Sequence, residues 1–240
     1  DAAQAGRPYA ERFNAVMAGL AASVGTTAGG PKLLAGTGSD QTHLLVVMTS
    51  ERGLCGGFNS NIAKMVRLAT KKLLAEGKAV KIITVGKKGR DALRRDFGDK
   101  FVDHVDLSDV KRVGYNNAAG IAEQVLSRFD AGEFDVATIF FSEFISIINQ
   151  LPTEVQVIPA KFELADAEST KYDYEPSEEG ILADLLPRAV ATQIFTALLE
   201  NGASEQGARM SAMDNATRNA GEMIEKLTIQ YNRSRQAKIT

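Results

Sequence analysis

The fold is decided by the last 53 residues of the chain, residues 188–240, which read RAVATQIFTALLENGASEQGARMSAMDNATRNAGEMIEKLTIQYNRSRQAKIT. No proline interrupts them, and from Met213 onward spacings of three and four residues define a seam of Met213, Ala216, Ala220, Met223, Leu227, Gln230, Ser234 and Ala237. This spacing is typical of a coiled-coil helix. As one helix the stretch would be about 80 Å long, whereas a compact globule of this length is only about 45 Å across. The sequence therefore predicts a helix that projects from the body of the protein.

A projecting helix with an apolar stripe needs a packing partner, because isolated helices owe most of their stability to packing. The candidate within this chain is the N-terminal segment, residues 1–24, where four large side chains fall on one face: Tyr9, Phe13, Val16 and Leu20. As a helix that segment spans about 36 Å. We therefore expect an antiparallel coiled coil in which roughly half of the C-terminal helix lacks a partner. Either other chains surround that half, or part of the N-terminal helix is absent from this sequence.

The end of the long helix is basic. Between Arg209 and Thr240 there are six basic and three acidic residues, a net charge of +3. The large residues of the seam also give way to Gln230, Ser234 and Ala237. Two interpretations remain open, a solvated helix face or a slender basic tip that fits an acidic cavity formed by partners.

Composition limits the class of protein. The chain has 240 residues, of which 44% are hydrophobic, and this is enough for a substantial core. A formal net charge of −2 argues against a dedicated nucleic-acid-binding protein, whose surface would be strongly basic. One cysteine excludes an internal disulfide framework and fits a reducing compartment. Since no unbroken apolar run of about 18 residues and no signal-peptide pattern occur, we expect attachment to a membrane only through partners.

The centre of the chain alternates strand and helix patterns. Apolar or alternating runs predict strands at residues 43–49, 80–85, 101–107, 135–145 and 153–158. Helical patterns at residues 60–76, 87–97 and 116–129 separate the first four. This order predicts an α/β domain with a mostly parallel sheet, residues 43–49 at its centre, residues 101–107 at an edge and the last strand antiparallel. Leu151 and Pro152 are expected to turn the chain between the last two strands.

The expected organisation has five parts: an N-terminal coiled-coil helix at residues 1–24, a linker at 25–42, the sheet domain at 43–160, a connection at 161–176 and the long helix at 177–240. The linker contains five glycines and Pro31, too many helix and strand breakers for regular structure. Residues 161–179 hold seven acidic residues and two lysines, as expected of a surface connection. Pro187 should kink or interrupt the helix that follows.

A glycine-rich turn follows the first predicted strand and reads Ser50-Glu51-Arg52-Gly53-Leu54-Cys55-Gly56-Gly57-Phe58-Asn59-Ser60-Asn61. Asn59 or Ser60 is the expected N-cap of the next helix. A strand, glycines and a helix start also make phosphate cradles, but the dinucleotide and P-loop spacings are missing, so a tight structural turn is favoured. Cys55, His43 and His104 match no nucleophilic or metal-binding pattern. We therefore assign no catalytic, cofactor-binding or metal-binding residue.

Two stretches resemble one known family. The first is Glu51-Arg52-Gly53-Leu54-Cys55-Gly56-Gly57-Phe58-Asn59-Ser60-Asn61-Ile62, and the second comprises residues 208–217 (ARMSAMDNAT) and 231–240 (YNRSRQAKIT). With them the chain resembles the gamma subunit, or central stalk, of the rotary F-type ATP synthase over essentially its whole length. Family members begin with a further lysine-rich stretch of helix and continue past Ile239 and Thr240, so the resemblance implies that both helices are incomplete here.

The resemblance implies a non-catalytic rotor shaft, with a Rossmann-like sheet domain inserted between two helices that pair as a coiled coil. The shaft would turn inside the hexameric ring of alpha and beta subunits, while the sheet domain would meet the epsilon subunit and the membrane ring of c subunits. Proton flow would drive the rotation, on the cytoplasmic face of a bacterial inner membrane or the matrix face of a mitochondrial one. No cofactor is implied.

Four residues match partner contacts of that family. Arg235 and Gln236 match a polar pair that engages a catch loop of the beta subunit, and Thr240 lies one turn further on. Arg209 matches an arginine of the lower helix near the beta-subunit lever. The resemblance therefore makes these four the candidates for contacts with the beta subunits.

Two other functions remain as alternatives. The first is an α/β nucleotide-binding enzyme that uses the turn at residues 53–57 and dimerises through its helical arms. The second is a coiled-coil adaptor that does not rotate. Calorimetry with ATP and dinucleotides would test the first, and co-purification with a hexameric ATPase ring would separate a rotor from other adaptors.

Overall fold

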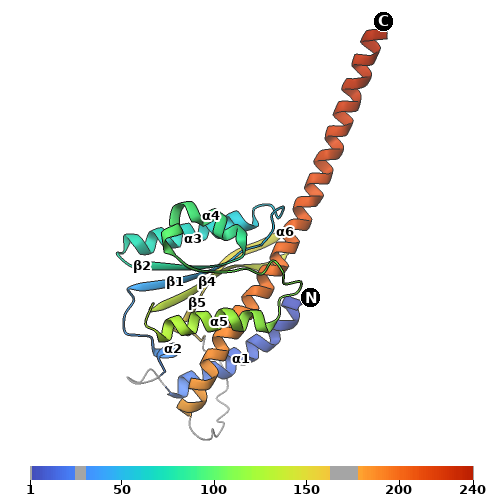
Figure 1. The fold of residues 1–240 in the computed structure, drawn as a ribbon. Helices are drawn as coiled ribbons and strands as arrows, with labels where there is room; N and C mark the ends of the chain where they lie inside the picture. Colours follow the sequence, from blue (N-terminus) through green and yellow to red (C-terminus); the bar gives the residue numbers. More distant parts are fainter. Residues whose placement is uncertain (1, 25–30, 163–177, 240) are drawn as a thin grey trace.

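The computed structural model describes residues 2–24, 31–162 and 178–239, whose arrangement is shown in Figure 1. One sheet crosses the body of the molecule with helices on both faces, and one long helix runs past the sheet and projects far beyond it. The strands are β1 (Thr42–Met48), β2 (Ala79–Val85), β3 (Phe101–Val105), β4 (Val136–Ser146) and β5 (Asn149–Ile158). The helices are α1 (Ala2–Val24), α2 (Lys32–Ala35), α3 (Phe58–Ala75), α4 (Lys87–Phe97), α5 (Tyr115–Asp130) and α6 (Glu178–Ile239), and a 3-10 turn (Gly98–Lys100) follows α4.

The sheet has the order β3-β2-β1-β4-β5. β1 lies at its centre and pairs in parallel with β2 and β4. β3 forms one edge, parallel to β2, and β5 forms the other edge, antiparallel to β4. The expected mostly parallel α/β sheet is therefore confirmed, together with its central strand, its edge strand and its antiparallel last strand. The direction of winding reverses beside β1, because the chain builds β2 and β3 on one side of it before it crosses to β4 on the other.

Alternate residues of β1 divide the core into two layers. Leu44, Val46 and Met48 belong to the layer with α5 and residues 190–198 of α6, whereas Leu45 and Val47 belong to the layer with α3 and α4. Each of these five side chains is at most 1% exposed. Because helices cover both faces of the sheet at β1, the strand must be apolar on both sides, as its sequence is.

The connection between the last two strands differs from the expectation. Leu151 and Pro152 do not turn the chain, because both lie inside β5, where Pro152 pairs with Ser142. The turn falls at residues 147–148 instead. Proline is tolerated at this position because β5 is an edge strand, where one backbone N–H can be missing without breaking the ladder.

Two further local expectations are wrong. Helix α3 begins at Phe58 after Gly57 and has no side-chain N-cap, so neither Asn59 nor Ser60 caps it. The linker that was expected to lack regular structure contains the one-turn helix α2. Residues 25–30 of that linker, and residues 163–176 of the expected acidic connection, lie outside the described residues.

Helices α1 and α6 pack side by side and run in opposite directions (Figure 1). Arg7, near the start of α1, bonds to Glu200 of α6, whereas Met17 packs in one cluster with Leu182 and Leu186, much earlier in α6. This antiparallel pairing confirms the predicted coiled coil of the two terminal helices. It covers only the part of α6 that also packs on the sheet domain.

Only part of the expected face of α1 packs against the rest of the protein. Tyr9 is 68% exposed and Val16 is 49% exposed, so both point away from the core. Phe13 and Leu20 of the expected face do pack, and Ala10 and Met17 take the places of Tyr9 and Val16 beside them. This set also has spacings of three and four residues, so two overlapping stripes satisfied the helical pattern, and only contact with α6 selects one of them.

Helix α6 continues through Pro187, where the sequence predicts a kink or an interruption, and the helix is not interrupted there. Leu186 and Ala189, on either side of the proline, are at most 2% exposed. Burial on both sides compensates for the backbone hydrogen bond that proline cannot make.

Within the described residues, α6 is also a helix long and apolar enough, by length and composition alone, to cross a membrane. An 18-residue window of it has a mean hydropathy of 1.3, and half of that window is buried inside the protein. Because a core helix passes the same test, this finding is weak evidence for a membrane span.

Candidate functional site

The outer part of α6, residues 213–239, is exposed along its whole length, and we call it the bare shaft. It leaves the body beside the sheet and carries the C-terminal end far from it (Figure 1). The predicted seam lies on this part, where Met223 is 63% and Leu227 is 57% exposed. Exposed large side chains also include Ile224, Ile229 and Tyr231. So many exposed apolar side chains on one helix mark a surface for other molecules.

The structure places only part of the predicted contact set on the bare shaft. Arg235 and Gln236 lie there, exposed and close to its end. Thr240 lies outside the described residues. Arg209 lies 26 residues before Arg235 on the same helix, about 39 Å away along its axis. The four residues therefore do not form one cluster, because Arg209 lies beside the sheet and Arg235 and Gln236 lie near the far end of the helix.

Arg209 is held within the chain. Its Nη2 lies 2.6 Å from Oε1 of Glu205, one turn earlier, and also donates to the carbonyl of Gly53 at 3.4 Å. The side chains of Arg209 and Glu205 are 25% and 20% exposed. Arg209 thus joins α6 to the glycine-rich turn and presents only part of its surface to solvent.

The sheet domain, formed by β1–β5 with α3, α4 and α5 and called the foot from here on, grips α6 just before the bare shaft begins. β4 is longer than its neighbour β1, and the last paired residues are Val47 and Phe140. Beyond that point the side of β4 that faced β1 meets α6. The Ser142 N–H donates to Asn201 Oδ1 at 3.1 Å, and the Ser204 hydroxyl donates to the Ser142 carbonyl at 2.9 Å. Side chains of α6 therefore replace the missing strand.

The same replacement occurs two residues further along β4. The Phe144 N–H donates to Glu200 Oε2 at 3.0 Å, and Arg7 Nη2 of α1 donates to the Phe144 carbonyl at 3.0 Å. Arg7 also holds both carboxylate oxygens of Glu200, with contacts of 2.7 and 3.0 Å. The hydrogen bond to Glu200 raises the pKa of Arg7 above its ordinary value. The Glu200 side chain is only 5% exposed, so its charge is paired where it is buried.

The place where a doubly wound sheet commonly binds a ligand is filled by α6. Such sites lie at the carboxyl ends of the strands where the winding reverses, which here is between β1 and β4. Gly56, in the turn after β1, has a φ of +56°, and a Cβ there would lie 3.8 Å from the Cβ of Ala212 on α6. A cavity of only about 190 Å³ is lined by this turn, by Gln150 and Pro152 of β5 and by Ala208 of α6. The glycine-rich turn thus packs beside the shaft.

Polar side chains hold the loops at the carboxyl ends of the strands. The Ser50 N–H donates to Asn59 Oδ1 at 3.0 Å, and Asn59 Nδ2 lies 3.2 Å from the buried sulfur of Cys55. Glu51 accepts the N–H of Lys87 at 3.0 Å and the N–H of Leu107 at 2.8 Å. Glu51 therefore ties together the loops that follow β1, β2 and β3, and the basic helix α4 starts from a fixed point.

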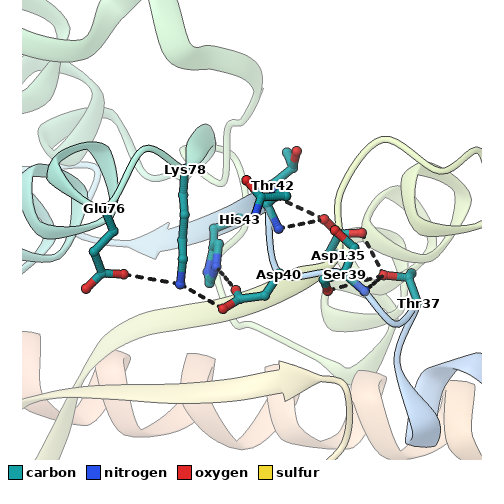
Figure 2. Close-up of polar contacts among 9 residues, drawn as sticks. Thr37, Ser39, Asp40, Thr42, His43, Glu76, Lys78 and Asp135 are labelled. Atoms are coloured by element: carbon teal, nitrogen blue, oxygen red, sulfur yellow. Dashed lines mark hydrogen bonds and ion pairs between the residues drawn. The ribbon is translucent and has the colours of Figure 1, made fainter.

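A second polar network lies at the opposite ends of the strands, where β1 begins (Figure 2). Asp40 is 2.7 Å from Lys78 Nζ and 2.5 Å from His43 Nε2. The hydrogen bond from Lys78, followed by that from His43, lowers the pKa of Asp40, and Asp40 is the first cause of the raised pKa of Lys78. These contacts fasten the start of β1 to the start of β2, since Lys78 immediately precedes β2.

Asp135 performs the same task between β1 and β4. It accepts the Thr37 hydroxyl at 2.6 Å and the N–H groups of Gln41 and Thr42 at 3.1 and 3.0 Å (Figure 2). The hydrogen bond from Thr37 is the main cause of its lowered pKa. Both networks are explained as structural, because every partner belongs to a strand end or to the segment that leads into it.

Among the described residues no group of three or more histidine, cysteine or acidic side chains could hold a metal ion. His104 Nδ1 lies 2.7 Å from the Thr84 hydroxyl of the neighbouring strand. That contact accounts for the position of His104 on β3 as part of the sheet.

The residues that join the shaft to the foot were not found from the sequence. The signal was present, because Glu200, Asn201 and Ser204 interrupt the apolar stripe of a helix that is otherwise buried at this level. A pattern of that kind predicts buried polar contacts. Their partners could not be predicted, because they are backbone groups, which every residue has, and the sequence does not show which of them lack a neighbouring strand.

The whole chain, residues 1–240, matches the family described as ATP synthase. It is 75% identical to the ATP synthase gamma chain of Dinoroseobacter shibae, over all of this chain and 83% of that protein. It is 73% identical to the ATP synthase gamma chain of a Ruegeria species, again over all of this chain and 83% of the relative.

Solved structures show the same fold. The central stalk and c-ring structure of the mitochondrial ATP synthase from Tetrahymena thermophila contains a chain that matches with a TM-score of 0.66 and 25% identity, covering 90% of this chain and 94% of that one. The rotor of the Euglena gracilis mitochondrial ATP synthase matches with a TM-score of 0.64 and 21% identity, covering 99% and 94%. The second likeness concerns the fold alone.

Proposed function

This chain belongs to the ATP synthase gamma chain family, and from that premise we propose that its bare shaft is held by the alpha and beta subunits while its foot meets the epsilon subunit and the c-subunit ring. The chain itself is a non-catalytic subunit of the complex and forms its rotor shaft, with catalysis on the beta subunits. The complex is membrane-associated and couples ion transport to ATP synthesis. In this proposal the ion that drives rotation is the proton.

The observation that carries the proposal is the bare shaft. A helix of 27 residues, residues 213–239, stands exposed with its large apolar side chains in solvent. Helices of that kind gain most of their stability from packing against another surface. A hexameric ring around the shaft supplies such a surface on all sides, whereas a flat partner would cover only one face.

The tip is suited to contacts that break and form again. Its seam ends in Gln230, Ser234 and Ala237, and Arg235 and Gln236 are exposed beside it. Small residues and exposed charges bind a partner without the large apolar contact that would trap one rotational position. We therefore assign Arg235 and Gln236 to the catch loop of a beta subunit, with Thr240 one turn further on.

Arg209 has a more restricted role in the proposal. Because Glu205 and the Gly53 carbonyl already hold its guanidinium, it can reach a beta-subunit lever only with the surface that stays exposed. An acidic group on the lever would bind to the arginine in addition to Glu205.

The relatives above 70% identity come from bacteria. We therefore place the complex at the bacterial inner membrane, with this chain on the cytoplasmic face. The chain would be peripheral, attached through its partners. The apolar part of α6 that resembles a membrane span is consistent with this position, because half of it is buried against the rest of the chain.

The proposal is tested by replacing Arg235 and Gln236 together with alanine in the assembled complex. We expect coupled ATP synthesis in membrane vesicles to fall at least about threefold, which corresponds to roughly 0.7 kcal/mol of lost contact energy. The melting temperature of the isolated chain should stay within about 2 °C, because exposed substitutions change stability by no more than about 0.5 kcal/mol.

A matched control removes one basic side chain and one amide elsewhere on the bare shaft, in the double variant Lys226→Ala with Asn219→Ala. Both positions are exposed. Synthesis in this control should exceed that of the tip variant. If the two double variants lose the same activity, or if the tip variant loses folding and coupling in parallel, the assignment of the tip is wrong.

A further inference from the structure

We propose that the hydrogen bonds between β4 and the side chains of Glu200, Asn201 and Ser204, which we call the joint, fix the rotational angle of the shaft relative to the foot. This inference rests on the proposed function, since a fixed angle matters only in a chain that transmits rotation. It assigns a positioning role to three residues of α6 and to Arg7 of α1, none of which is part of the predicted contact surface.

The joint lies close to the place where α6 leaves the foot, about one turn before the buried residues Gly207 and Ala208. Below it the helix is held by an apolar stripe of Val190, Ile194, Ala197 and Leu198, each at most 5% exposed. At the joint the buried residues become polar, and Glu200, Asn201 and Ser204 are 4%, 5% and 0% exposed. Beyond the joint the foot touches α6 only around residues 207–212, through Arg209 and through small residues such as Gly207 and Ala208, and from residue 213 onward the helix is exposed. A twist applied to the bare shaft therefore passes these contacts and reaches the buried hydrogen bonds of the joint one to two turns further along the helix.

The two kinds of contact respond differently to a twist. Apolar packing is non-directional, so a helix can rotate or slide by small amounts with little loss of buried area. A hydrogen bond weakens steeply when its angle or length departs from the optimum. Four backbone groups of β4, the N–H and C=O of Ser142 and Phe144, are each bound by a different side chain. Rotation of α6 would strain the three contacts that its own side chains make.

Arg7 makes the layer stiffer by joining three elements. It contacts the Phe144 carbonyl of β4 and both oxygens of Glu200 on α6, while its own backbone belongs to α1. A two-point contact between guanidinium and carboxylate fixes orientation as well as distance. Buried polar contacts of this kind are best attested as devices that fix register between helices.

The test measures torsional stiffness in the assembled ATP synthase. The catalytic ring is fixed to a surface and stalled with a non-hydrolysable ATP analogue, and a bead is attached to the foot at Asp109→Cys. Asp109 is exposed, whereas the chain's own cysteine, Cys55, is 2% exposed, so a chain labelled before assembly carries the bead at one position. Angular fluctuations of the bead report the stiffness of the connection between foot and ring. The variant is Asn201→Ala with Ser204→Ala.

We expect the angular variance to rise about twofold, because the variant leaves two of the four backbone groups without their side-chain partner. The matched control is Leu198→Ala, which destabilises the same helix through an apolar cavity and should leave the variance close to that of the unaltered chain. Ser204→Ala alone should give a smaller rise that Ser204→Thr reverses, since threonine keeps the hydroxyl.

An unchanged variance in the double variant would overturn the proposal, and so would a rise in Leu198→Ala that matches it at equal loss of melting temperature. If the double variant does not assemble, the single variants decide: an angular variance in Ser204→Ala no greater than in Ser204→Thr would overturn the proposal. Failure of the proposed function looks different: the unaltered chain would then not turn the bead when the ring is supplied with ATP.

Discussion

The two halves of α6 have similar helical patterns and opposite surroundings. Residues 182–208 pack against α1, α5 and the sheet, so that Ile194 is fully buried. Residues 213–239 have the same spacing of apolar positions, yet Leu227 is 57% exposed. Residue choice differs in part, because the buried half combines valine, isoleucine and leucine with several alanines, whereas the seam of the exposed half includes two methionines and a glutamine. Adaptable or small side chains suit a surface that several partner conformations must fit.

The comparison implies that stability resides in one half of the helix and partner contact in the other. If this is correct, equal substitutions in the two halves must have unequal effects on the isolated chain. Pairs of variants test this directly, and in the pair of glycine variants on α6 the change in helix propensity is the same at both positions.

The largest difference is expected between Ile194→Ala and Leu227→Ala. The first opens a cavity in the core and should lower the free energy of unfolding by about 2–5 kcal/mol. The second should change it by less than about 0.5 kcal/mol, because its side chain is already in solvent. Urea denaturation followed by circular dichroism gives both values. A loss of similar size at the two positions would mean that the isolated chain folds its bare shaft against itself.

A second pair compares glycines. A Cβ at Gly207 would lie 3.1 Å from Phe144 Cε2 and 3.4 Å from the Ile147 Cα, whereas at Gly221 it would meet nothing within 4 Å. Gly207→Leu should therefore cost about 1–3 kcal/mol through overpacking against the β4–β5 hairpin. Gly221→Leu should increase helix stability by up to about 1 kcal/mol. Thermal melts of the two variants should shift in opposite directions, and shifts of the same sign would contradict the packing of α6 on the hairpin.

The third test locates the sensitivity to acid in the foot. Since the pKa of Asp135 is lowered in the folded chain, its ionised form contributes stability that is present above the ordinary value of 3.8 and is lost as the pH falls below it. Asp135→Asn should therefore lower the melting temperature by a few degrees at neutral pH, and the difference from the unaltered chain should shrink on acidification. Glu222→Gln, exposed on the bare shaft, is the control for the loss of one carboxylate at neutral pH, and a difference at Asp135 that does not shrink in acid would contradict the prediction.

The smallest effect concerns two ion pairs with the same i, i+4 spacing. Glu205 and Arg209 are 20% and 25% exposed, while Asp214 and Arg218 are 72% and 67% exposed. Glu205→Gln should cost about 1 kcal/mol and Asp214→Asn about 0.3 kcal/mol, because water screens the second pair. Adding salt should weaken the outer pair more. Equal losses would indicate that partial burial adds nothing to the Glu205–Arg209 pair.

Much of the fold follows from the sequence because helix and strand periodicity are local properties. The apolar run at residues 43–49 predicts a strand buried on both faces, and the sheet places it at the centre. A local pattern cannot decide between two faces of one helix when both have apolar residues at helical spacing. The stripe through Tyr9 and Val16 and the stripe through Ala10 and Met17 are both helical, and only contact with α6 selects the second.

The candidate contact residues came from motif similarity, and the structure leaves their roles as proposals. It shows that Arg235 and Gln236 are exposed on the bare shaft, and that Arg209 is half-buried beside Glu205. The sequence could not reveal the latter difference, because the carbonyl of Gly53 that Arg209 binds lies 156 positions away in the chain.

By itself the sequence determined that this protein has a helix too long for its own body, since length and heptad spacing depend only on the order of residues. Only the tertiary structure decided where that helix is gripped. β1 stops at Met48 while β4 continues to Ser146, and the difference in strand length leaves backbone groups of β4 for Glu200, Asn201 and Ser204 to bind. The physical reason is that a buried backbone N–H or C=O must find a partner, and which partner is near depends on packing between distant segments.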